Sequence, residues 1–195
     1  LIGTQMIAKG LDFPDVTLVG VINADTMLKL PDFRAAERTF DLLEQVAGRA
    51  GRGEKPGKVI IQSYWSTHPA IASVVTHDRR PFLDAELKER REGAYPPFSR
   101  LSNVLFWGAS EKEVRRVADQ MAEALHTKLD AQIGWEILGP ADCVKAKVKD
   151  KYRRHILVKS PVDAQVGEIL SECAASLDKR VGINMTLDVD AYDMM

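Results

Sequence analysis

Two arginines, each directly after a glycine, end a helical pattern in the run Gln45 to Gly53 (QVAGRAGRG). Arg49 and Arg52 lie three residues apart, and a Gly/Pro-rich turn follows them. Guanidinium groups at a helix end can reach the phosphates of a nucleotide held by a neighbouring domain. There they neutralise charge as the γ-phosphoryl group leaves. Two solvated arginines at a helix C-terminus, favoured by the helix dipole, explain the same pattern, so both interpretations stay open on these residues alone.

A second candidate for chemistry is the basic run VKAKVKDKYRRHILVK, in which the six basic residues between 145 and 154 face a single acid, Asp150. Its alternation predicts that Val144, Ala146 and Val148 point inward while the intervening lysines share the outer strand face. Such a face suits the DNA phosphate backbone, and the tyrosine at the tip could stack on a base. A charged edge that prevents strand-to-strand aggregation is the alternative. The predicted DNA contacts are Lys145, Lys147, Lys149, Lys151, Tyr152, Arg153 and Arg154.

The N-terminal segment LIGTQMIAKGLDF favours the first interpretation of the arginine pair. Together, GT-x4-KGLD and the later Q-x-x-GR-x-GR resemble motifs V and VI of superfamily 2 helicases, in the right order. DFRAAERTFDLLEQVAGRAGRG and REGAYPPFSRL resemble one family in particular, that of primosomal protein N′, the replication-restart DNA helicases. The resemblance covers essentially all 195 residues. It is strongest over 3–53, next over 91–100, and weakest in the C-terminal half.

This resemblance implies roles for single residues of the motor segment. Arg52 is the expected arginine finger, Arg49 its phosphate-facing neighbour, and Gln45 couples the two ligand sites by hydrogen bonding. Asp12 contacts the nucleotide ribose, because its acceptor oxygens suit a hydroxyl, and Thr4 touches the nucleic-acid backbone. Taken singly, these residues have ordinary structural explanations; it is their joint spacing that favours the helicase interpretation. The predicted nucleotide-binding set is Asp12, Gly10 and Gly48.

The sequence contains neither a G-x-x-x-x-G-K-[ST] phosphate loop nor a DExH-like acidic pair after a buried strand. We therefore expect an excised C-terminal fragment that hydrolyses no ATP by itself, its ATP–Mg²⁺ site being completed by a missing N-terminal lobe. The family's zinc-binding cysteine cluster is also absent, so zinc is expected only in a module outside this chain. Cys143 and Cys173 are predicted to behave as small apolar residues, with no metal site.

Composition fits a cytoplasmic protein without a membrane segment. The chain is 45% hydrophobic, with room for one or two small cores. No apolar run approaches the ~18 residues of a membrane span, and we expect no signal peptide. The net charge of −1 excludes a uniformly basic nucleic-acid binder, so DNA contact must come from a local patch.

The predicted fold class is α/β: a partial RecA-like helicase lobe followed by an α+β domain. Residues 1–72 read as the C-terminal part of the second RecA-like lobe, with strands at 16–22 and 59–61. The first of these strands is almost continuously apolar, as expected for a strand covered on both faces, and Asp32 is predicted to cap the helix between them. Residues 73–98 form a linker or helical connection.

Residues 99–195 alternate clearly between strand and helix patterns. A strand at 101–107, a helix opened by a Ser110–Glu113 capping box, and two extended arms precede a helix expected to begin at Ser160-Pro161. A strictly alternating strand ends the domain, giving the order βαββαβ, a ferredoxin-like plan. By resemblance this is an S10-like C-terminal domain. Trp107 and Trp135 are predicted to lie in its core.

The function predicted for the intact parent is an ATP-dependent 3′–5′ DNA helicase in replication restart and primosome assembly. By resemblance it binds forked and single-stranded DNA at stalled forks and D-loops. Its expected partners are single-strand-binding protein and other primosome proteins. Two alternatives stay open. One is a standalone DNA-binding or scaffold module with a helicase-like remnant. The other is an RNA helicase of the same superfamily, in which histidine is usual where Gln45 stands and a βαββαβ tail is not expected.

Overall fold

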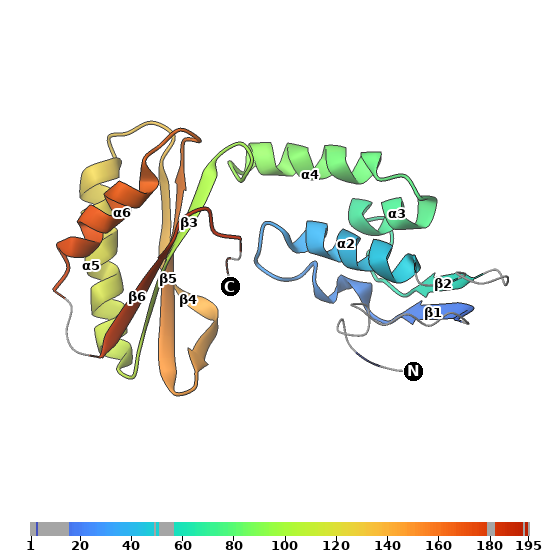
Figure 1. Ribbon diagram of the computed structural model, residues 1–195, viewed down its shortest axis with the longest axis horizontal. Helices are drawn as coiled ribbons and strands as arrows, with labels where there is room; N and C mark the ends of the chain where they lie inside the picture. The colour runs from blue at the N-terminus through green and yellow to red at the C-terminus, as the bar shows by residue number, and fades with distance from the viewer. Residues whose placement is uncertain are drawn as a thin grey trace. The chain divides into compact units, whose positions relative to one another are not determined.

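The computed structural model describes residues 3, 16–48, 50, 57–178, 182–192 and 194. The chain divides into two compact units, Leu1–Glu89 and Arg90–Met195. Each unit has its own β-sheet, with two strands in the first unit and four in the second among the described residues (Figure 1). The protein is therefore a mixed α/β chain with two separate sheets.

The sheet of the first unit joins two short parallel strands, β1 (Leu18–Val21) and β2 (Lys58–Ile61). Residues on one face of this sheet, including Val21 and Ile61, pack against the hydrophobic core of the unit. On the opposite face Leu18 is 59% exposed. The prediction that the first strand is covered on both faces is thus wrong for the described residues, since the helices cover only one of its faces.

Three α-helices contribute to the first unit's core, one that precedes β2 in the chain and two that follow it. Phe40 of α2 (Ala35–Ala47) stacks on Phe82 of α4 (Arg80–Glu92) with ring centroids 4.5 Å apart. The third core helix, α3 (Pro69–Thr76), lies between β2 and α4 in the chain. The two helices after β2 therefore contribute side chains to this core.

Asp32 stands before α2 but does not cap it as predicted. Its Oδ1 accepts a hydrogen bond from the Arg34 backbone N–H (2.9 Å), and its Oδ2 lies 3.2 Å from Arg38 Nη1. The helix begins later, at Ala35, whose N–H donates to the Asp32 carbonyl oxygen. The carboxylate therefore stabilises the turn that leads into the helix.

Asp25 is a buried carboxylate in the short 3₁₀ helix η1 (Ala24–Thr26). It accepts hydrogen bonds from Ser63 Oγ at 2.6 Å and from the backbone N–H groups of Tyr64 and Trp65 at 2.8 and 3.2 Å. The Ser63 hydroxyl, more than the two backbone donors, lowers the pKa of Asp25 below its ordinary value. These bonds fasten the chain segment after β2 to η1.

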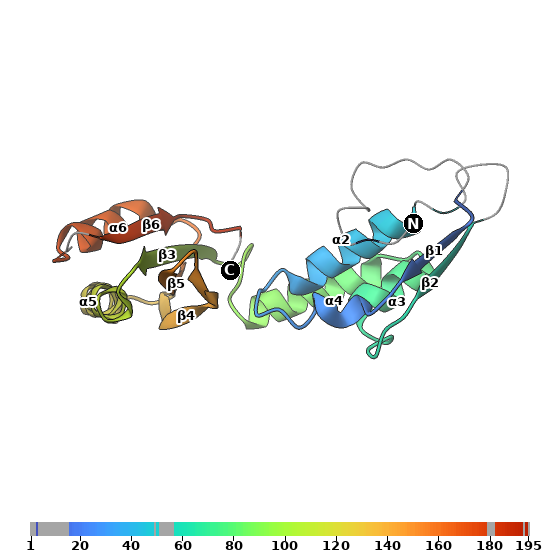
Figure 2. The same ribbon diagram turned by 90° about the horizontal axis from the view of Figure 1, so that it is seen from below.

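The second unit has the element order βαββαβ, and its sheet is antiparallel throughout with the strand order β4-β5-β3-β6. Helices α5 and α6 cover one face of this sheet (Figures 1 and 2). The predicted alternation of strands and helices is present. The elements are β3 (Arg100–Gly108), α5 (Glu111–Leu129), β4 (Glu136–Val148), β5 (Lys151–Ser160), α6 (Val166–Ala175) and β6 (Ile183–Asp188).

The core of the second unit lies between the helices and the sheet, where Val104 and Phe106 of β3 are fully buried. The Ser110 side chain caps α5 as predicted, because its Oγ accepts from the Glu113 N–H at 3.4 Å. The predicted apolar stripe of α5 is confirmed, since all of its members are buried: Val114, Val117, Ala118, Met121, Leu125 and Leu129.

The predicted start of α6 and the predicted burial of Trp107 are wrong. Helix α6 begins at Val166, not at Ser160-Pro161, because Ser160 is taken up in the ladder opposite Arg100 as the last residue of β5. Trp107 is absent from the core cluster, whereas Trp135 packs against it. Successive strand residues point to opposite faces, so Trp107, next to the buried Phe106, lies on the face away from the helices.

Lys159 fixes the segment before β3 onto this helix-free face. Its side chain is 7% exposed, and its ammonium group donates to the Gly93 carbonyl oxygen at 2.8 Å. The same nitrogen lies 2.8 Å from Glu136 Oε2 and 4.2 Å from the Tyr95 ring centroid. The buried ammonium group thus has three partners. Two of them, Gly93 and Tyr95, belong to the segment before β3, so this segment covers that end of the face.

Arg100 holds the C-terminal segment at the same end of the sheet. Its guanidinium binds both carboxylate oxygens of Asp190, at 2.7 and 2.6 Å, and donates to the Ala164 carbonyl oxygen at 2.9 Å. The Ala191 N–H donates to the Leu101 carbonyl oxygen at 2.7 Å. The hydrogen bonds from Arg100 lower the pKa of Asp190.

We predict that Asp25→Asn destabilises the first unit and weakens its response to acid. A carboxylate whose folded pKa is lowered contributes stability above its ordinary pKa of 3.8, and that contribution is lost as the pH falls through the folded pKa. Thermal unfolding of the chain, followed by circular dichroism at neutral pH and at acidic pH, measures both effects. Asp84→Asn, an exposed aspartate on α4, is the matched control, and equal unfolding midpoints for the two variants would contradict the role of Asp25.

Candidate nucleic-acid interface

The basic run predicted from the sequence forms a β-hairpin at the end of β4 and β5. Val148 pairs with Lys151, which leaves Lys149 and Asp150 as the two turn residues. Both are left-handed, with φ of 48° and 59°, the combination of a type I′ turn, whose twist matches that of the strands. The prediction that Lys149 shares a strand face with its neighbouring lysines is therefore wrong.

Strand β4 bulges away from β5 just before this turn (Figure 1). Asp142 pairs with Arg154 and Lys147 with Tyr152, so residues 143–146 lie opposite the single residue Arg153. A bulge bends its strand, and Figure 1 shows this part of β4 on the side of the sheet away from α5 and α6. As a result Val144 is 52% exposed, and the predicted inward direction of Val144, Ala146 and Val148 is wrong.

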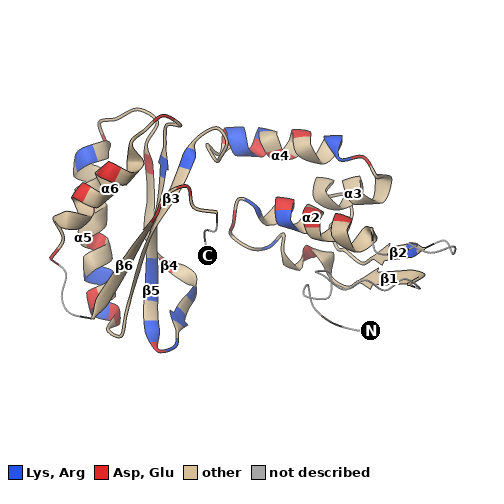
Figure 3. Ribbon diagram, viewed as in Figure 1, with Lys and Arg blue, Asp and Glu red and all other residues tan. Residues whose placement is uncertain are grey.

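Basic side chains are concentrated on this hairpin, as the sequence predicted (Figure 3). Between residues 145 and 154 there are six basic residues and one acidic residue. Lys145, Lys149 and Lys151 are exposed. The single acid, Asp150, lies 3.2 Å from Lys147 Nζ, so it offsets only one of the lysines. The tip therefore has a local positive charge although the whole chain is close to neutral.

Three of the predicted contact residues, Arg154, Tyr152 and Lys147, already have partners within the unit. The Arg154 side chain is 14% exposed; its Nη2 donates to the Pro140 carbonyl oxygen at 2.9 Å, and its Nε lies 3.4 Å from Asp142 Oδ1. Tyr152 packs against the core, and Lys147 Nζ lies 5.1 Å from its ring centroid. Arg154 thus braces the bulge, and Lys147 already contacts the ring of Tyr152.

Arg153 changes the titration of two neighbours at the base of the hairpin. Burial raises the pKa of the Cys143 thiol, and the positive charge of Arg153 opposes that rise. Burial also lowers the pKa of His155, and Arg153 lowers it further. His155 is therefore neutral at neutral pH, so Arg153, and not His155, supplies the positive charge at this place on the helix-free face.

Of the predicted motor residues, two lie in described parts of the first unit. Gln45 is exposed in the last turn of α2, and the N–H of Gly48 ends that helix by donating to the Glu44 carbonyl oxygen at 2.9 Å. The predicted helix leading into the arginine pair is thus confirmed. The remaining members of the set, Thr4, Gly10, Asp12, Arg49 and Arg52, lie outside the described residues.

The part of the chain that the structure describes contains no group of three or more His, Cys, Asp or Glu side chains that could hold a metal ion. Both cysteines are free thiols, and burial raises the pKa of Cys173 as it does that of Cys143. None of the described helices combines the length and apolarity needed to cross a bilayer.

Two sheets in separate units, one of them extended by a basic hairpin, define a multidomain α/β protein. Residues 91–192, the second unit apart from its ends, match a family described as primosomal protein N C-terminal domain. The chain belongs to this family, because the match extends over more than half of its length.

Curated relatives extend the similarity to the first unit. The replication restart protein PriA of Bacillus subtilis (strain 168) is 43% identical over the whole of this chain and 24% of its own length. Those of Treponema pallidum (strain Nichols) and Synechocystis sp. are 42% and 45% identical, over 100% and 83% of this chain. The chain spans 29% of the Treponema relative and 19% of the Synechocystis one, so it corresponds to a minor part of these longer proteins.

We predict that neither cysteine reacts readily with a thiol reagent in the native protein. Only the thiolate is nucleophilic, and burial both shields the two sulfur atoms and raises their pKa values. Titration with a chromogenic disulfide reagent should therefore show slow modification in buffer and rapid modification of both thiols in denaturant. Ala131→Cys, at an exposed position after α5, supplies a reactive control. Fast native modification of Cys143 would mean that the base of the hairpin opens readily.

Proposed function

We propose that this chain is the C-terminal part of an ATP-dependent 3′–5′ DNA helicase that acts in replication restart, and that its second unit contacts DNA. The observation that carries the proposal is the exposed, positively charged hairpin in a chain of this family. A fixed cluster of lysines on a nearly neutral protein suits a polyanion, because each phosphate contact releases a counterion.

The first unit is proposed to be the C-terminal part of a RecA-like lobe, over residues 1–72. The parallel pairing of β1 with β2, joined by a connection that contains α2, supports this. Residues 73–98 form the helical connection, whose inner side chains pack on the first core. Residues 99–195 form a ferredoxin-like, S10-like domain; its order βαββαβ and its strand arrangement β4-β5-β3-β6 support this.

The nucleotide of the intact protein is proposed to be ATP with Mg²⁺, held largely by another lobe. Arg52 would act as the arginine finger, with Arg49 beside it, and each guanidinium would neutralise phosphate charge. Support comes from α2, whose last turn presents Gln45 and ends at Gly48, directly before this pair. Asp12 and Gly10 complete the proposed nucleotide contacts, and a zinc-binding module is proposed only elsewhere in the parent.

DNA is proposed to bind along the hairpin through its phosphates. Lys145, Lys149 and Lys151 supply exposed charge, Arg153 supplies charge at the base, and Thr4 is proposed as a backbone contact from the first unit. Arg154 is better regarded as a positioning residue, since it is tied to Pro140 and Asp142. Stacking of a base on Tyr152 requires Lys147 to leave the ring.

The partners proposed for the intact protein are forked and single-stranded DNA, single-strand-binding protein and other primosome proteins, in the cytoplasm. The relatives are named replication restart proteins. That name supports DNA over RNA as the nucleic acid, and a working motor over a standalone scaffold.

Reversing the exposed hairpin charges should weaken DNA binding to many sequences alike. We expect Lys145→Glu, Lys149→Glu and Lys151→Glu together to reduce the slope of log K against log salt by about 2–3, the value for three lost phosphate contacts. Titration of labelled DNA at several salt concentrations measures this. The matched control reverses three exposed basic residues elsewhere, Lys58, Lys112 and Arg115. An unchanged slope in the hairpin variant would contradict the phosphate contacts. It would favour the alternative that the lysines only prevent aggregation at the strand edge.

In the intact parent, Arg52→Ala should leave ATP bound but reduce turnover by roughly 10³–10⁵, because the guanidinium acts on charge that develops in the transition state. Arg52→Lys should restore little, since lysine lacks the planar fork. Arg49→Ala should lose more in nucleotide affinity. Steady-state hydrolysis and nucleotide binding, measured separately, distinguish these effects. A large rise in the ATP Kd with normal turnover at saturation would move the finger role from Arg52 to Arg49.

A further inference from the structure

On the face of the second unit's sheet that the helices leave uncovered, the burial of side chains decreases along the strands toward the hairpin. At the end where β3 begins, Leu101 and Lys159 form a pair that is almost fully buried, with Tyr95 and Gly93 against the lysine. Toward the hairpin the face opens, because Trp107 is only partly buried. A ligand can therefore reach this face at its hairpin end.

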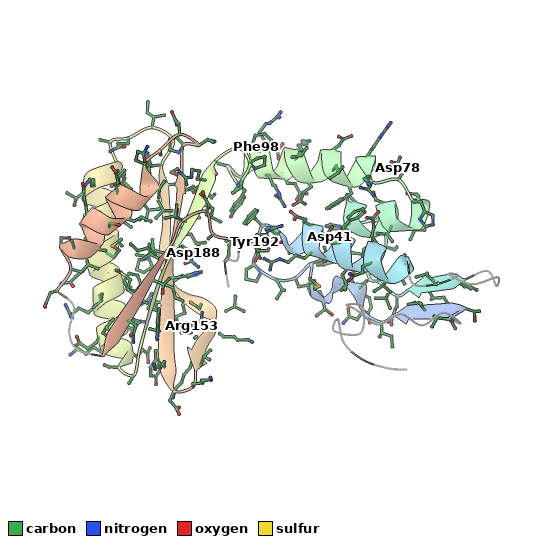
Figure 4. All side chains as sticks on the ribbon, in the orientation of Figure 1. Asp41, Asp78, Phe98, Arg153, Asp188 and Tyr192 are labelled. Atoms are coloured by element: carbon green, nitrogen blue, oxygen red, sulfur yellow. The ribbon has the colours of Figure 1, made fainter. Side chains whose placement is uncertain are left out.

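Strand register defines which side chains meet at the open end. Trp107 of β3 pairs with Arg153 of β5 on one side and with Asn184 of β6 on the other. In the next row Leu105 pairs with His155 and, on its other side, with Thr186 of β6. Paired residues of neighbouring antiparallel strands point to the same face with Cβ atoms ~5 Å apart, so these side chains form one surface. Figure 4 shows Arg153 and Asp188 on this face, away from α5 and α6.

The chemistry of this surface suits a nucleobase better than a protein partner. An aromatic ring lies beside a guanidinium, an exposed amide, an exposed hydroxyl and a neutral imidazole. A protein-docking face would be expected to carry several apolar side chains at its centre. In the two rows that run from β5 across β3 to β6, Trp107 and Leu105 are the only apolar residues. A ring that stacks a base and cations that hold its phosphates are the elements of a single-strand site.

The position of Arg153 joins this surface to the basic hairpin. Arg153 is the residue of β5 that faces the β4 bulge, where Lys145 lies, and the exposed Lys149 and Lys151 lie beyond it toward the turn. A strand whose phosphates follow the lysines would thus bring its next base over the sheet at Trp107. Bases inside a duplex cannot stack in this way, because both of their faces are already covered by their neighbours.

We propose that the helix-free face of the second unit's sheet binds an unpaired base of single-stranded DNA, which stacks on Trp107 while Arg153 holds the adjacent phosphate. Asn184 and Thr186 offer hydrogen-bonding groups at the edge of the same site. The proposal deepens the DNA contact proposed above and rests on it. It adds a base contact, and with it a preference for single strands, to a hairpin that contacts phosphates alone.

The test compares two ligands on the full chain: a thymidine oligonucleotide and an abasic oligonucleotide of the same length. Trp107→Ala should weaken binding of the thymidine oligonucleotide roughly 5- to 100-fold, the range for loss of one stacked base. It should leave binding of the abasic oligonucleotide and the salt slope nearly unchanged. Trp107→Phe should retain most of the affinity. Trp65→Ala, which removes a 47% exposed tryptophan of the first unit, should change neither ligand.

The outcomes separate the stacking site from the phosphate contact. Equal weakening of both ligands by Trp107→Ala, or no weakening of either, would overturn the stacking proposal and leave the hairpin contact standing. Failure of the wild-type chain to bind either ligand would overturn both proposals. If Trp107→Ala does not fold, Trp107→Leu decides, because it keeps apolar volume but has no ring. Full affinity of that variant for the thymidine oligonucleotide would contradict stacking.

Discussion

The packing of α5 and α6 on one face only of a four-stranded sheet is the constraint on which the second unit depends. Val104 and Phe106 of β3 must face the helices, since both are fully buried in the core. With a side-chain period of two, a slip of one residue would expose the whole core face. The register is thereby determined, and with it the set of residues on the opposite face: Leu101, Asn103, Leu105 and Trp107.

The opposite face is stabilised at one end and left open at the other. Lys159 is buried against Gly93, Tyr95 and Glu136 at the closed end, where leaving its charge without partners would be costly. At the other end the β4 bulge, braced by Arg154, directs the hairpin into solvent. Structural polar contacts and candidate ligand contacts thus lie at different ends of the same sheet. This separation explains how a nearly neutral chain can have a local positively charged surface.

Several elements of the second unit could be predicted because their signal is local. The apolar stripe of α5 recurs every three to four residues in the sequence, and the Ser110 cap stands directly before it. The start of α6 could not be predicted in this way, because Ser160 is held in the sheet by Arg100, which is distant in the sequence. A serine and a proline satisfy the local rules for a helix start, but strand pairing takes precedence over them.

For the candidate site, the sequence predicted which residues are present but not how they are arranged. The density of basic residues in the sequence correctly indicated an exposed basic hairpin. It gave no sign of the bulge at 143–146 or of the engagement of Arg154 with Pro140. The position of Trp107 was available from strand alternation, since it differs in parity from Val104 and Phe106, but the burial usual for tryptophan led to the wrong prediction. The roles of Arg49, Arg52 and Asp12 stay predictions, as these residues lie outside the described part of the chain.

The central claim is that DNA meets this chain at the hairpin and the helix-free sheet face of the second unit. Backbone and indole N–H chemical shifts, recorded during titration with single-stranded DNA, test it most directly. The account predicts that the largest changes fall on residues 144–153 and on the Trp107 indole, while the outer surfaces of α5 and α6 change little. Shifts concentrated on α5 and α6, with the hairpin and Trp107 unmoved, would contradict it.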